Sequence, residues 1–351
     1  MAINYDAFLL VSFGGPEGPD DVMPFLENVL RGRNVPRERM LQVAEHYYHF
    51  GGKSPINDQN RSLMAALRAE FEAHGVELPI YWGNRNWHPM LADTLRQMQA
   101  DGVQRALAFA TSAYSSYSSC RQYRENIAAA QATVGEGAPA VDKLRVFHNH
   151  PLWVEANVEQ VRRALEGIPE ERRAAARIAY TAHSIPQSMA ESCGYQRQLL
   201  EVARLVSNAL GRSGDAMVFQ SRSGPPTQPW LEPDVLDHLR TLRGEGSIDV
   251  VIAPIGFVSD HMEVLYDLDT EAAQLCRELG LNMVRAATAG THRKFVRMVR
   301  ELVEERISDS PERATVGIYP ANPDVCLTDC CPAPPRLPMA GVRPNPVEAA
   351  R

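Results

Sequence analysis

The chain has 351 residues, of which 44% are hydrophobic, and it carries 36 Lys and Arg against 43 Asp and Glu, a formal net charge of −7. Such a composition is typical of a soluble globular protein of about two domains. The negative charge and the lack of a basic, aromatic-interleaved patch argue against a nucleic-acid partner, and no apolar run is long enough for a membrane span. The N-terminal region has no basic segment typical of a signal peptide, so we expect a cytoplasmic protein with reduced thiols.

The first half of the chain alternates predicted strands with predicted helices. Strands are expected at Ala7–Phe13, Leu78–Trp82, Arg105–Thr111 and Leu144–Phe147. Asp20 or Asp21 is predicted to cap the helix after the first strand. The loop Gly14–Pro16 is not a GxGxxG motif, and GGKS at 51–54 lacks the upstream strand and glycine of a P-loop. We therefore expect no nucleotide cofactor.

Three residues that can bind a flat acidic ligand follow the predicted strand Leu78–Trp82. Arg85, Trp87 and His88 lie at its carboxyl end, where open α/β sheets place their ligands. The indole would stack on the ligand and the guanidinium would pair with an anion. A capped loop around a packed tryptophan is the alternative interpretation of the same residues.

The second half of the chain shows the same alternation of predicted strands and helices. Its strands are predicted at Arg177–Thr181, Ala216–Gln220, Val250–Ala253 and Asn282–Ala286. Two sets of four strands alternating with helices predict two similar α/β halves with parallel sheets. We place the halves at residues 1–155 and 156–290, a C-terminal helix and extension at 291–331, and a flexible tail at 332–351.

An acidic segment follows the third strand of the second half. Ser259 or Asp260 is predicted to cap a helix, on which the carboxylates are spaced 3, 4 and 4 residues apart. They are Asp260, Glu263, Asp267 and Glu271. At about 100° and 1.5 Å per residue they would form a rail about 16 Å long on one helix face. A solvated helix face is the alternative, but the position after a buried strand favours a ligand site.

A histidine follows the first strand of the same half. His183 lies at the carboxyl end of Arg177–Thr181, so it can face the crevice together with the carboxylates. An imidazole opposite carboxylates can accept protons near neutral pH or bind Fe²⁺. A structural histidine is the alternative. Ser221 and Arg222, in a loop of the same half, could contact carboxylates, and Trp230 could pack against a flat ligand or the core.

Five motifs together make the chain resemble ferrochelatases. They are SFGGP at 12–16, GGKSPI at 51–56, TAHSIP at 181–186, FQSRSGP at 219–225 and SDHMEVLYDLDTE at 259–271. The resemblance implies a class II chelatase fold of two flavodoxin-like halves and insertion of Fe²⁺ into a porphyrin. It implies that His183 and Glu263 act from opposite sides of the macrocycle, with Asp260, Asp267 and Glu271 as a path to solvent. Phe13 stands at a first-loop position that varies within the family.

The cysteines near the C-terminus resemble the ligands of those ferrochelatases that carry a [2Fe–2S] cluster. Cys326, Cys330 and Cys331 match the C-terminal ligands, and Cys120 matches the internal one. Four thiolates also suit zinc, and exposed tail cysteines without a metal are a further alternative.

The resemblance to the soluble Gram-positive branch and the basic segment Asn28–Gln42 favour coproporphyrin III over protoporphyrin IX, because four propionates require polar anchors. The candidate porphyrin-binding residues are Phe13, Arg31, Arg33, Arg85, Trp87, Tyr117, Arg222 and Trp230. A cobalt or nickel chelatase would typically present more histidines, and a porphyrin or haem carrier would need no proton acceptor. We expect a monomer with at most peripheral membrane contact.

Overall fold

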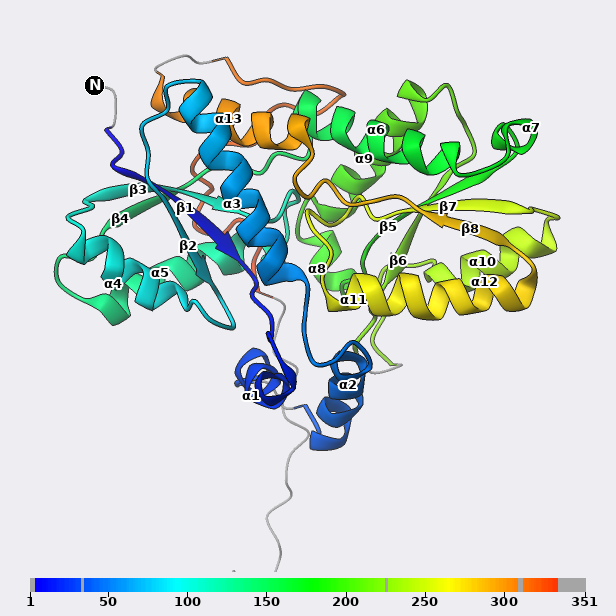
Figure 1. The fold of residues 1–351 in the computed structure, drawn as a ribbon, viewed down its shortest axis with the longest axis horizontal. Coiled ribbons are helices and arrows are strands. Elements are labelled where there is room, and N and C mark those ends of the chain that lie inside the picture. Colours follow the sequence, from blue (N-terminus) through cyan, green and yellow to red (C-terminus); the bar gives the residue numbers. More distant parts are fainter. Residues whose placement is uncertain (1–3, 33–34, 225–226, 309–311, 334–351) are drawn as a thin grey trace, which may run out of the picture.

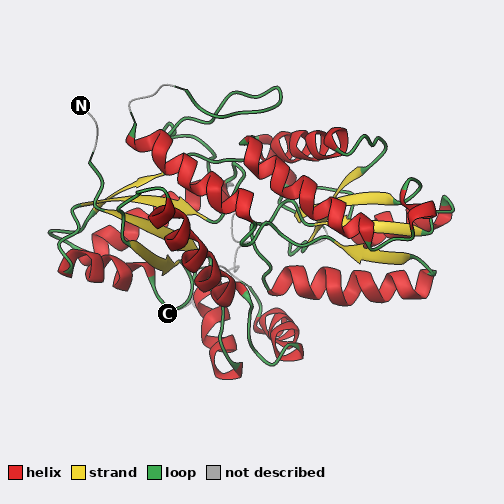
Figure 2. Ribbon diagram, turned by 45° about the horizontal axis from the view of Figure 1, so that its top comes forward, coloured by secondary structure: helices red, strands yellow, loops and turns green. Residues whose placement is uncertain are grey.

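The structure is a computed structural model that describes residues 4–32, 35–224, 227–308 and 312–333. It contains two four-stranded parallel sheets side by side, the first at the left of Figure 1 and the second at the right. Helices cover both faces of each sheet (Figure 2). The predicted fold class, an α/β protein with two parallel sheets, is confirmed.

The first sheet has the strand order β2-β1-β3-β4. Its strands are β1 (Ala7–Ser12), β2 (Ile80–Asn84), β3 (Arg105–Ala110) and β4 (Ala140–Lys143). The helices of this half are α1 (Pro19–Val29), α2 (Arg37–His49), α3 (Ile56–Ala73), α4 (Leu91–Ala100) and α5 (Gln122–Val134). A π-helical turn, η1 (Tyr117–Arg121), precedes α5. Helices α1 and α2 project below the junction of the two halves (Figure 1).

The second sheet has the corresponding order, β6-β5-β7-β8. Its strands are β5 (Arg177–His183), β6 (Ala216–Gln220), β7 (Asp249–Ala253) and β8 (Asn282–Arg285). The helices are α6 (Pro151–Glu166), α7 (Glu170–Arg173), α8 (Gln187–Glu191), α9 (Tyr195–Ala209), α10 (Val235–Gly244), α11 (Met262–Val264), α12 (Ala273–Leu279) and α13 (Arg293–Ile307). A π-helix, η2 (Leu265–Ala272), joins α11 to α12.

One hydrophobic core spans both halves. Alternate residues of β1 face opposite sides: Ala7, Leu9 and Val11 pack with α4 and α5, whereas Phe8 and Leu10 join the larger core. That core continues through α3, α6, α9 and α13 to Tyr180 of β5. Because the strands are buried on both faces, their sequences are apolar runs without alternation. The shared core holds the two sheets in a fixed relative position.

Two local predictions were wrong. The fourth strand is Ala140–Lys143, not Leu144–Phe147. Leu144 and Phe147 are buried members of the larger core, but they belong to irregular chain. The true edge strand is polar and only half-buried. The predicted caps also differ, since Gly18 precedes α1 and His261 precedes α11. Asp20 and Asp21 lie instead in the first turn of α1, where the helix dipole favours acidic side chains.

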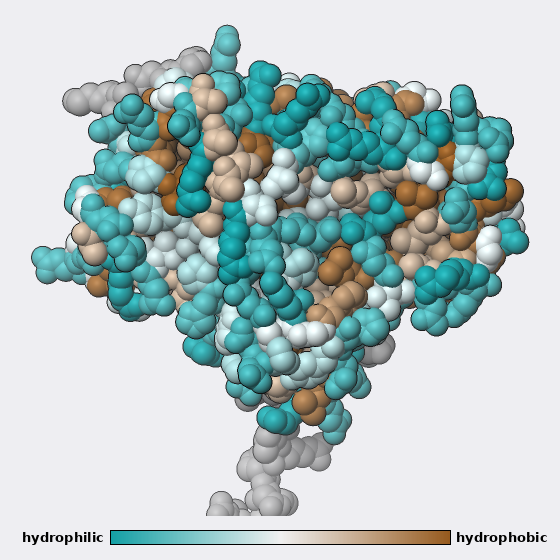
Figure 3. All heavy atoms as spheres, viewed as in Figure 1, coloured by the Kyte–Doolittle hydropathy of each residue, from teal (hydrophilic) through white to brown (hydrophobic). Residues whose placement is uncertain are grey.

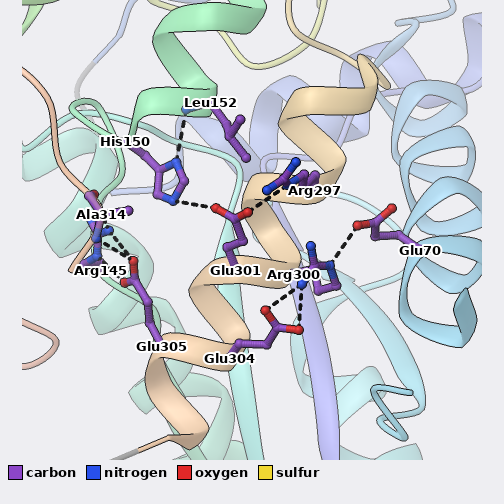
Figure 4. Close-up of polar contacts among 10 residues, drawn as sticks. All are labelled: Glu70, Arg145, His150, Leu152, Arg297, Arg300, Glu301, Glu304, Glu305 and Ala314. Atoms are coloured by element: carbon purple, nitrogen blue, oxygen red, sulfur yellow. Dashed lines mark hydrogen bonds and ion pairs between the residues drawn. The ribbon is translucent and has the colours of Figure 1, made fainter. Parts of the chain in front are cut away.

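Ion pairs tie α13 to its neighbours (Figure 4). The buried Arg145 donates to both carboxylate oxygens of Glu305 at 2.8 and 2.9 Å and to the carbonyl oxygen of Ala314 at 3.1 Å. Arg300 of the same helix donates to Glu70 at 2.8 Å, which connects α13 to α3. These contacts fix the helix that covers the junction of the halves and anchor the chain that follows it.

Arg145→Met is expected to lower the free energy of unfolding by about 3–5 kcal/mol, because it leaves the Glu305 carboxylate largely buried without its partner. Urea denaturation followed by circular dichroism measures the change. Arg297→Met is the matched control: its pair with Glu301 is exposed, so the cost should stay below about 1 kcal/mol. Equal effects of the two variants would contradict this account.

The surface and the helices have the polarity that the composition predicts. The face in Figure 3 is mainly hydrophilic, with scattered groups of hydrophobic residues. Among the helices of the described residues, none is both long and apolar enough to cross a membrane. The predicted tail lies mostly outside the described residues, which end at 333.

Candidate active site

His183 is the last residue of β5, and its ring faces Glu263 of α11. The distance from His183 Nε2 to Glu263 Oε2 is 3.5 Å. His183 Nδ1 lies against the carbonyl oxygen of Ser184. Since a carbonyl oxygen only accepts hydrogen bonds, the neutral ring carries its proton on Nδ1. This tautomer leaves the Nε2 lone pair available, directed toward Glu263, to accept a proton or bind a metal ion.

The loop that follows His183 is held by buried hydrogen bonds. The hydroxyl of Tyr195 donates to the carbonyl oxygen of His183 at 2.9 Å, and that of Ser184 donates to the carbonyl oxygen of Leu231 at 2.8 Å. The Ser184 N–H donates to the carbonyl oxygen of Gln220 at 2.8 Å. These bonds fix the histidine backbone, so the imidazole is positioned before any ligand binds.

The strand order explains why His183 and the acidic segment meet. β5 and β7 are neighbours in the centre of the second sheet, and their chains leave to opposite sides of it. Open α/β sheets bind ligands at such a switch point, outside the carboxyl ends of the strands. His183 ends β5, and the segment with Asp260 and Glu263 follows β7. The sequence-based expectation that the two lie near each other agrees with this placement.

The predicted regular helix of the rail was wrong in two respects. Asp260 precedes the helix, and its two carboxylate oxygens each accept a hydrogen bond from Arg285 at 3.1 Å. Asp267 and Glu271 lie in the π-helix η2, whose hydrogen bonds join residues i and i+5. The geometry of 100° per residue therefore does not describe this segment. Residue spacing alone carries no signal for a π-helix.

Asp267 is the most perturbed carboxyl group of the rail. Burial raises its pKa to about 7; the nearby carboxylates of Glu263 and Glu271 add to the rise, whereas the Ser221 hydroxyl, which donates to it, opposes the rise. Burial also raises the pKa of Glu271. A carboxyl group that is half protonated at neutral pH can both accept and release protons. The contact of Ser221 with a carboxylate was predicted from the sequence.

Three of the candidate porphyrin-binding residues of the first half, Phe13, Arg85 and Trp87, form one group. Phe13 is 36% exposed, and the Arg85 guanidinium lies 5.6 Å from its ring centroid and 4.7 Å from that of Tyr123. Trp87 packs edge-on against Phe25 and donates to Asp21 at 3.2 Å. Arg85 also donates to Asn126 at 2.7 Å. Phe13 and Arg85 thus lie together.

The remaining candidates are more dispersed. Trp230 forms a β-bridge with Pro186, in the loop after His183, and Arg222 lies 3.9 Å from Glu232. Arg31 is exposed in the turn after α1, and Tyr117 begins η1 and donates to Glu125 at 3.2 Å. Arg33 lies outside the described residues.

All four predicted cluster cysteines line one pocket of about 220 Å³ beside α5. Cys330 and Cys331 Sγ are 3.5 Å apart, and a hydrogen bond from Cys120 lowers the pKa of Cys326. Cys120 and Cys331 are buried. In the part of the chain that is described, no three His, Cys, Asp or Glu side chains form a site for a single metal ion.

The sequence interpretation missed several residues of the site. Arg285, the partner of Asp260, ends β8, and the carboxyl-end rule could have found it. Gln59 of α3 accepts a hydrogen bond from the Asp260 N–H at 2.9 Å. The His46 ring of α2 stacks on Tyr266 of η2, with centroids 3.6 Å apart. The last two contacts join the two halves and have no signal in the sequence.

The comparisons with known proteins agree with this architecture. The family model described as Ferrochelatase matches residues 5–307. The chain is 60% identical to a ferrochelatase of Rhodopirellula baltica, over 97% of both chains. It is 52% identical to the coproporphyrin III ferrochelatase of Streptomyces coelicolor, over 98% of both chains.

Two solved structures share the fold. SirB from Bacillus subtilis with Fe³⁺ matches with a TM-score of 0.55 at 11% identity, covering 89% of this chain and 99% of that one. The sirohydrochlorin chelatase SirB from Bacillus subtilis subspecies spizizenii, in complex with cobalt, matches with a TM-score of 0.51 at 12% identity, covering 87% and 96%. Two parallel sheets in this arrangement are the class II chelatase fold, and the chain belongs to the ferrochelatase family, lyases that insert iron into a porphyrin.

Proposed function

We propose that the protein inserts Fe²⁺ into coproporphyrin III, giving coprohaem III, and that His183 and Glu263 carry the reaction. The observation that carries this proposal is the 3.5 Å contact between His183 Nε2 and Glu263 Oε2 at the switch point of the second sheet. Metallation must remove two pyrrole protons and bring the pyrrole lone pairs onto the metal. A histidine with a free Nε2 beside a carboxylate is suited to accept those protons.

The distance between His183 and Glu263 limits whether the two residues can act from opposite sides of the macrocycle, as the resemblance implies. A flat ring cannot lie between two atoms 3.5 Å apart, so opposite-side action would require Glu263 to turn away. The geometry favours action from one face, with His183 accepting a proton and Glu263 stabilising the imidazolium. Asp267 and Glu271 would pass protons or Fe²⁺ along η2. Arg285 neutralises Asp260, which favours a structural role for that residue over a place in the path.

The substrate proposal is supported by the relatives that are named coproporphyrin III ferrochelatases at about 50% identity. Arg31, exposed at the end of α1, is proposed to bind a propionate, and Phe13 and Trp87 to contact the ring. Arg85 stacks on Phe13 and Tyr123, so we propose that it supports this wall. Protoporphyrin IX is the alternative substrate, and a non-catalytic carrier is the alternative function.

Anaerobic assays with coproporphyrin III and protoporphyrin IX in parallel test the substrate. The wild-type enzyme should show the larger kcat/KM with coproporphyrin III, and Arg31→Ala should raise the KM for it about 10-fold, the value of one charge-assisted hydrogen bond. Arg96→Ala removes an exposed arginine of α4 and should leave KM unchanged. A larger kcat/KM with protoporphyrin IX would overturn the substrate assignment.

We further propose that Cys120, Cys326, Cys330 and Cys331 hold a [2Fe–2S] cluster. The four cysteines line one pocket, with Cys330 and Cys331 Sγ 3.5 Å apart, and a binuclear cluster takes four thiolates, two on each iron. Arg121 and Arg124 hold the cysteine-bearing segment, donating to the carbonyl oxygens of Cys330 at 3.0 Å and Leu327 at 3.2 Å. The alternative of exposed tail cysteines is disfavoured because Cys331 is buried and Cys326 and Cys330 are partly buried. When bound, such a cluster supplies one-electron chemistry.

Metal and sulfide analysis tests the cluster. Anaerobically purified protein should contain about two irons and two acid-labile sulfides per chain, with visible absorption that Cys326→Ser abolishes. Cys276→Ser is the control, because this buried thiol of α12 belongs to another core, and it should leave the absorption unchanged. About one zinc per chain without sulfide would instead support a four-thiolate zinc site.

A further inference from the structure

Two asparagines lie behind the wall formed by Phe13, Arg85 and Trp87. Asn57 is the second residue of α3 and Asn84 is the last residue of β2, and both are fully buried. Asn84 Nδ2 donates to Asn57 Oδ1 at 3.2 Å. Buried amides are costly unless their hydrogen bonds are satisfied. The bonds that this pair makes therefore indicate what it holds in place.

The pair connects the two loops that carry the wall. Asn57 Nδ2 contacts the carbonyl oxygen of Gly15 at 3.2 Å, in the loop after β1, and that of His88 at 3.3 Å, in the loop after β2. It also contacts Glu17 Oε1 at 3.1 Å. Asn84 Nδ2 donates to the same His88 carbonyl oxygen at 3.0 Å. Two side chains thus set the position of both loops relative to α3.

The backbone packs too closely against this pair for another arrangement. Gly14 has a φ of +81°, and a Cβ added there would lie 2.8 Å from Asn84 Cβ and 3.1 Å from the Trp87 nitrogen. The loops also bond to each other directly: the Arg85 N–H donates to the Ser12 carbonyl oxygen at 3.0 Å, and the Asn86 N–H donates to that of Phe13 at 3.1 Å. A shift of the asparagines would move Phe13 and Trp87 together.

We infer that Asn57 and Asn84 are positioning residues for the porphyrin: they hold the loops of Phe13 and Trp87 in the arrangement that receives the macrocycle. The inference rests on the proposed function, because it assumes that this wall contacts the porphyrin. A flat, rigid ligand makes its contacts with both loops at once, so a small displacement of one loop removes contact area. The proposed site of Fe²⁺ is at His183 and Glu263 in the other half, so we expect its affinity to be independent of these loops.

The test separates porphyrin binding from iron binding. Asn57→Ala is expected to raise the KM for porphyrin about 10-fold, while kcat and the KM for Fe²⁺ stay within about threefold of the wild type. Asn57→Asp keeps the size of the side chain but loses the amide donors. It should likewise raise the KM for porphyrin and leave kcat and the KM for Fe²⁺ within about threefold of the wild type. The double variant Asn57→Ala/Asn84→Ala should be little worse than Asn57→Ala alone, because the two residues act as one unit.

Asn157→Ala is the matched control. Asn157 is also buried, and its Nδ2 donates to a carbonyl oxygen at 2.9 Å, that of Trp153 within α6. This variant should lose stability without a change in the KM for porphyrin. An unchanged KM in Asn57→Ala and Asn57→Asp, or an equal rise in Asn157→Ala, would overturn the inference. Porphyrin titration followed by tryptophan fluorescence measures the affinity for porphyrin without turnover. It therefore distinguishes failure of the inference from failure of the proposed activity.

Discussion

His183→Ala is expected to lower the kcat of iron insertion about 10²–10⁴-fold, while the Kd for porphyrin stays within a few-fold of the wild type. The range is that of a lost proton acceptor. The ring is held by its backbone and its Nε2 is available toward Glu263, so the change removes the acceptor without opening the loop. The decisive result is a lowered kcat with little change in the Kd for porphyrin, because loss of a residue that binds porphyrin would change the Kd as well.

Anaerobic metallation assays and porphyrin titrations, both followed by absorption, measure these two quantities. His74→Ala serves as the control, because His74 is exposed at the end of α3 and should leave both quantities unchanged. Turnover by His183→Ala within threefold of the wild type would remove His183 from the mechanism.

Asp267→Asn is expected to lower kcat about 10–100-fold and to change its dependence on pH. With the pKa of Asp267 at about 7, the wild-type carboxyl group becomes a proton acceptor as the pH rises from 6 to 8, and kcat should rise with it. The variant lacks this ionisation and should show a flatter profile over the same range. A profile identical to that of the wild type would exclude Asp267 from proton transfer.

The same shift predicts a dependence of stability on pH. The pKa of Asp267 is about 7 in the folded protein and about 3.9 in the unfolded chain, so the native state binds this proton more tightly. Its contribution to stability is complete below about pH 4 and is lost as the pH rises to about 7. Asp267→Asn should therefore gain about 2–4 kcal/mol relative to the wild type between pH 4 and pH 8. Urea denaturation at both pH values measures the difference.

Much of the fold was predictable from local pattern. Strands such as β1 and β7 are buried on both faces, so they appear in the sequence as continuous apolar runs with polar loops after them. The carboxyl-end rule then placed His183 close to the acidic segment, although His183 and Glu263 are 80 residues apart. This inference succeeded because it depends on topology and not on the details of packing.

The details that failed depend on long-range packing. The edge strand β4 is polar and half-exposed, so its sequence has no apolar run that would predict a strand. The neighbouring Leu144 and Phe147 are apolar because they pack in the core as irregular chain. The π-helix η2 arises from one added residue in a helical turn, which leaves no periodic signature. The contacts of Asp260 with Arg285, and of His46 with Tyr266, join elements that only the folded chain brings together.

Single-turnover metallation tests the central claim most directly. Wild-type protein loaded with coproporphyrin III is mixed anaerobically with Fe²⁺, and the porphyrin absorption is followed with time. We predict complete conversion to the iron porphyrin in the wild type and a rate at least about 10²-fold lower in Glu263→Gln, which keeps the size of the side chain but not its charge. Porphyrin that stays bound to the wild-type protein and is never metallated would contradict the account and favour a carrier.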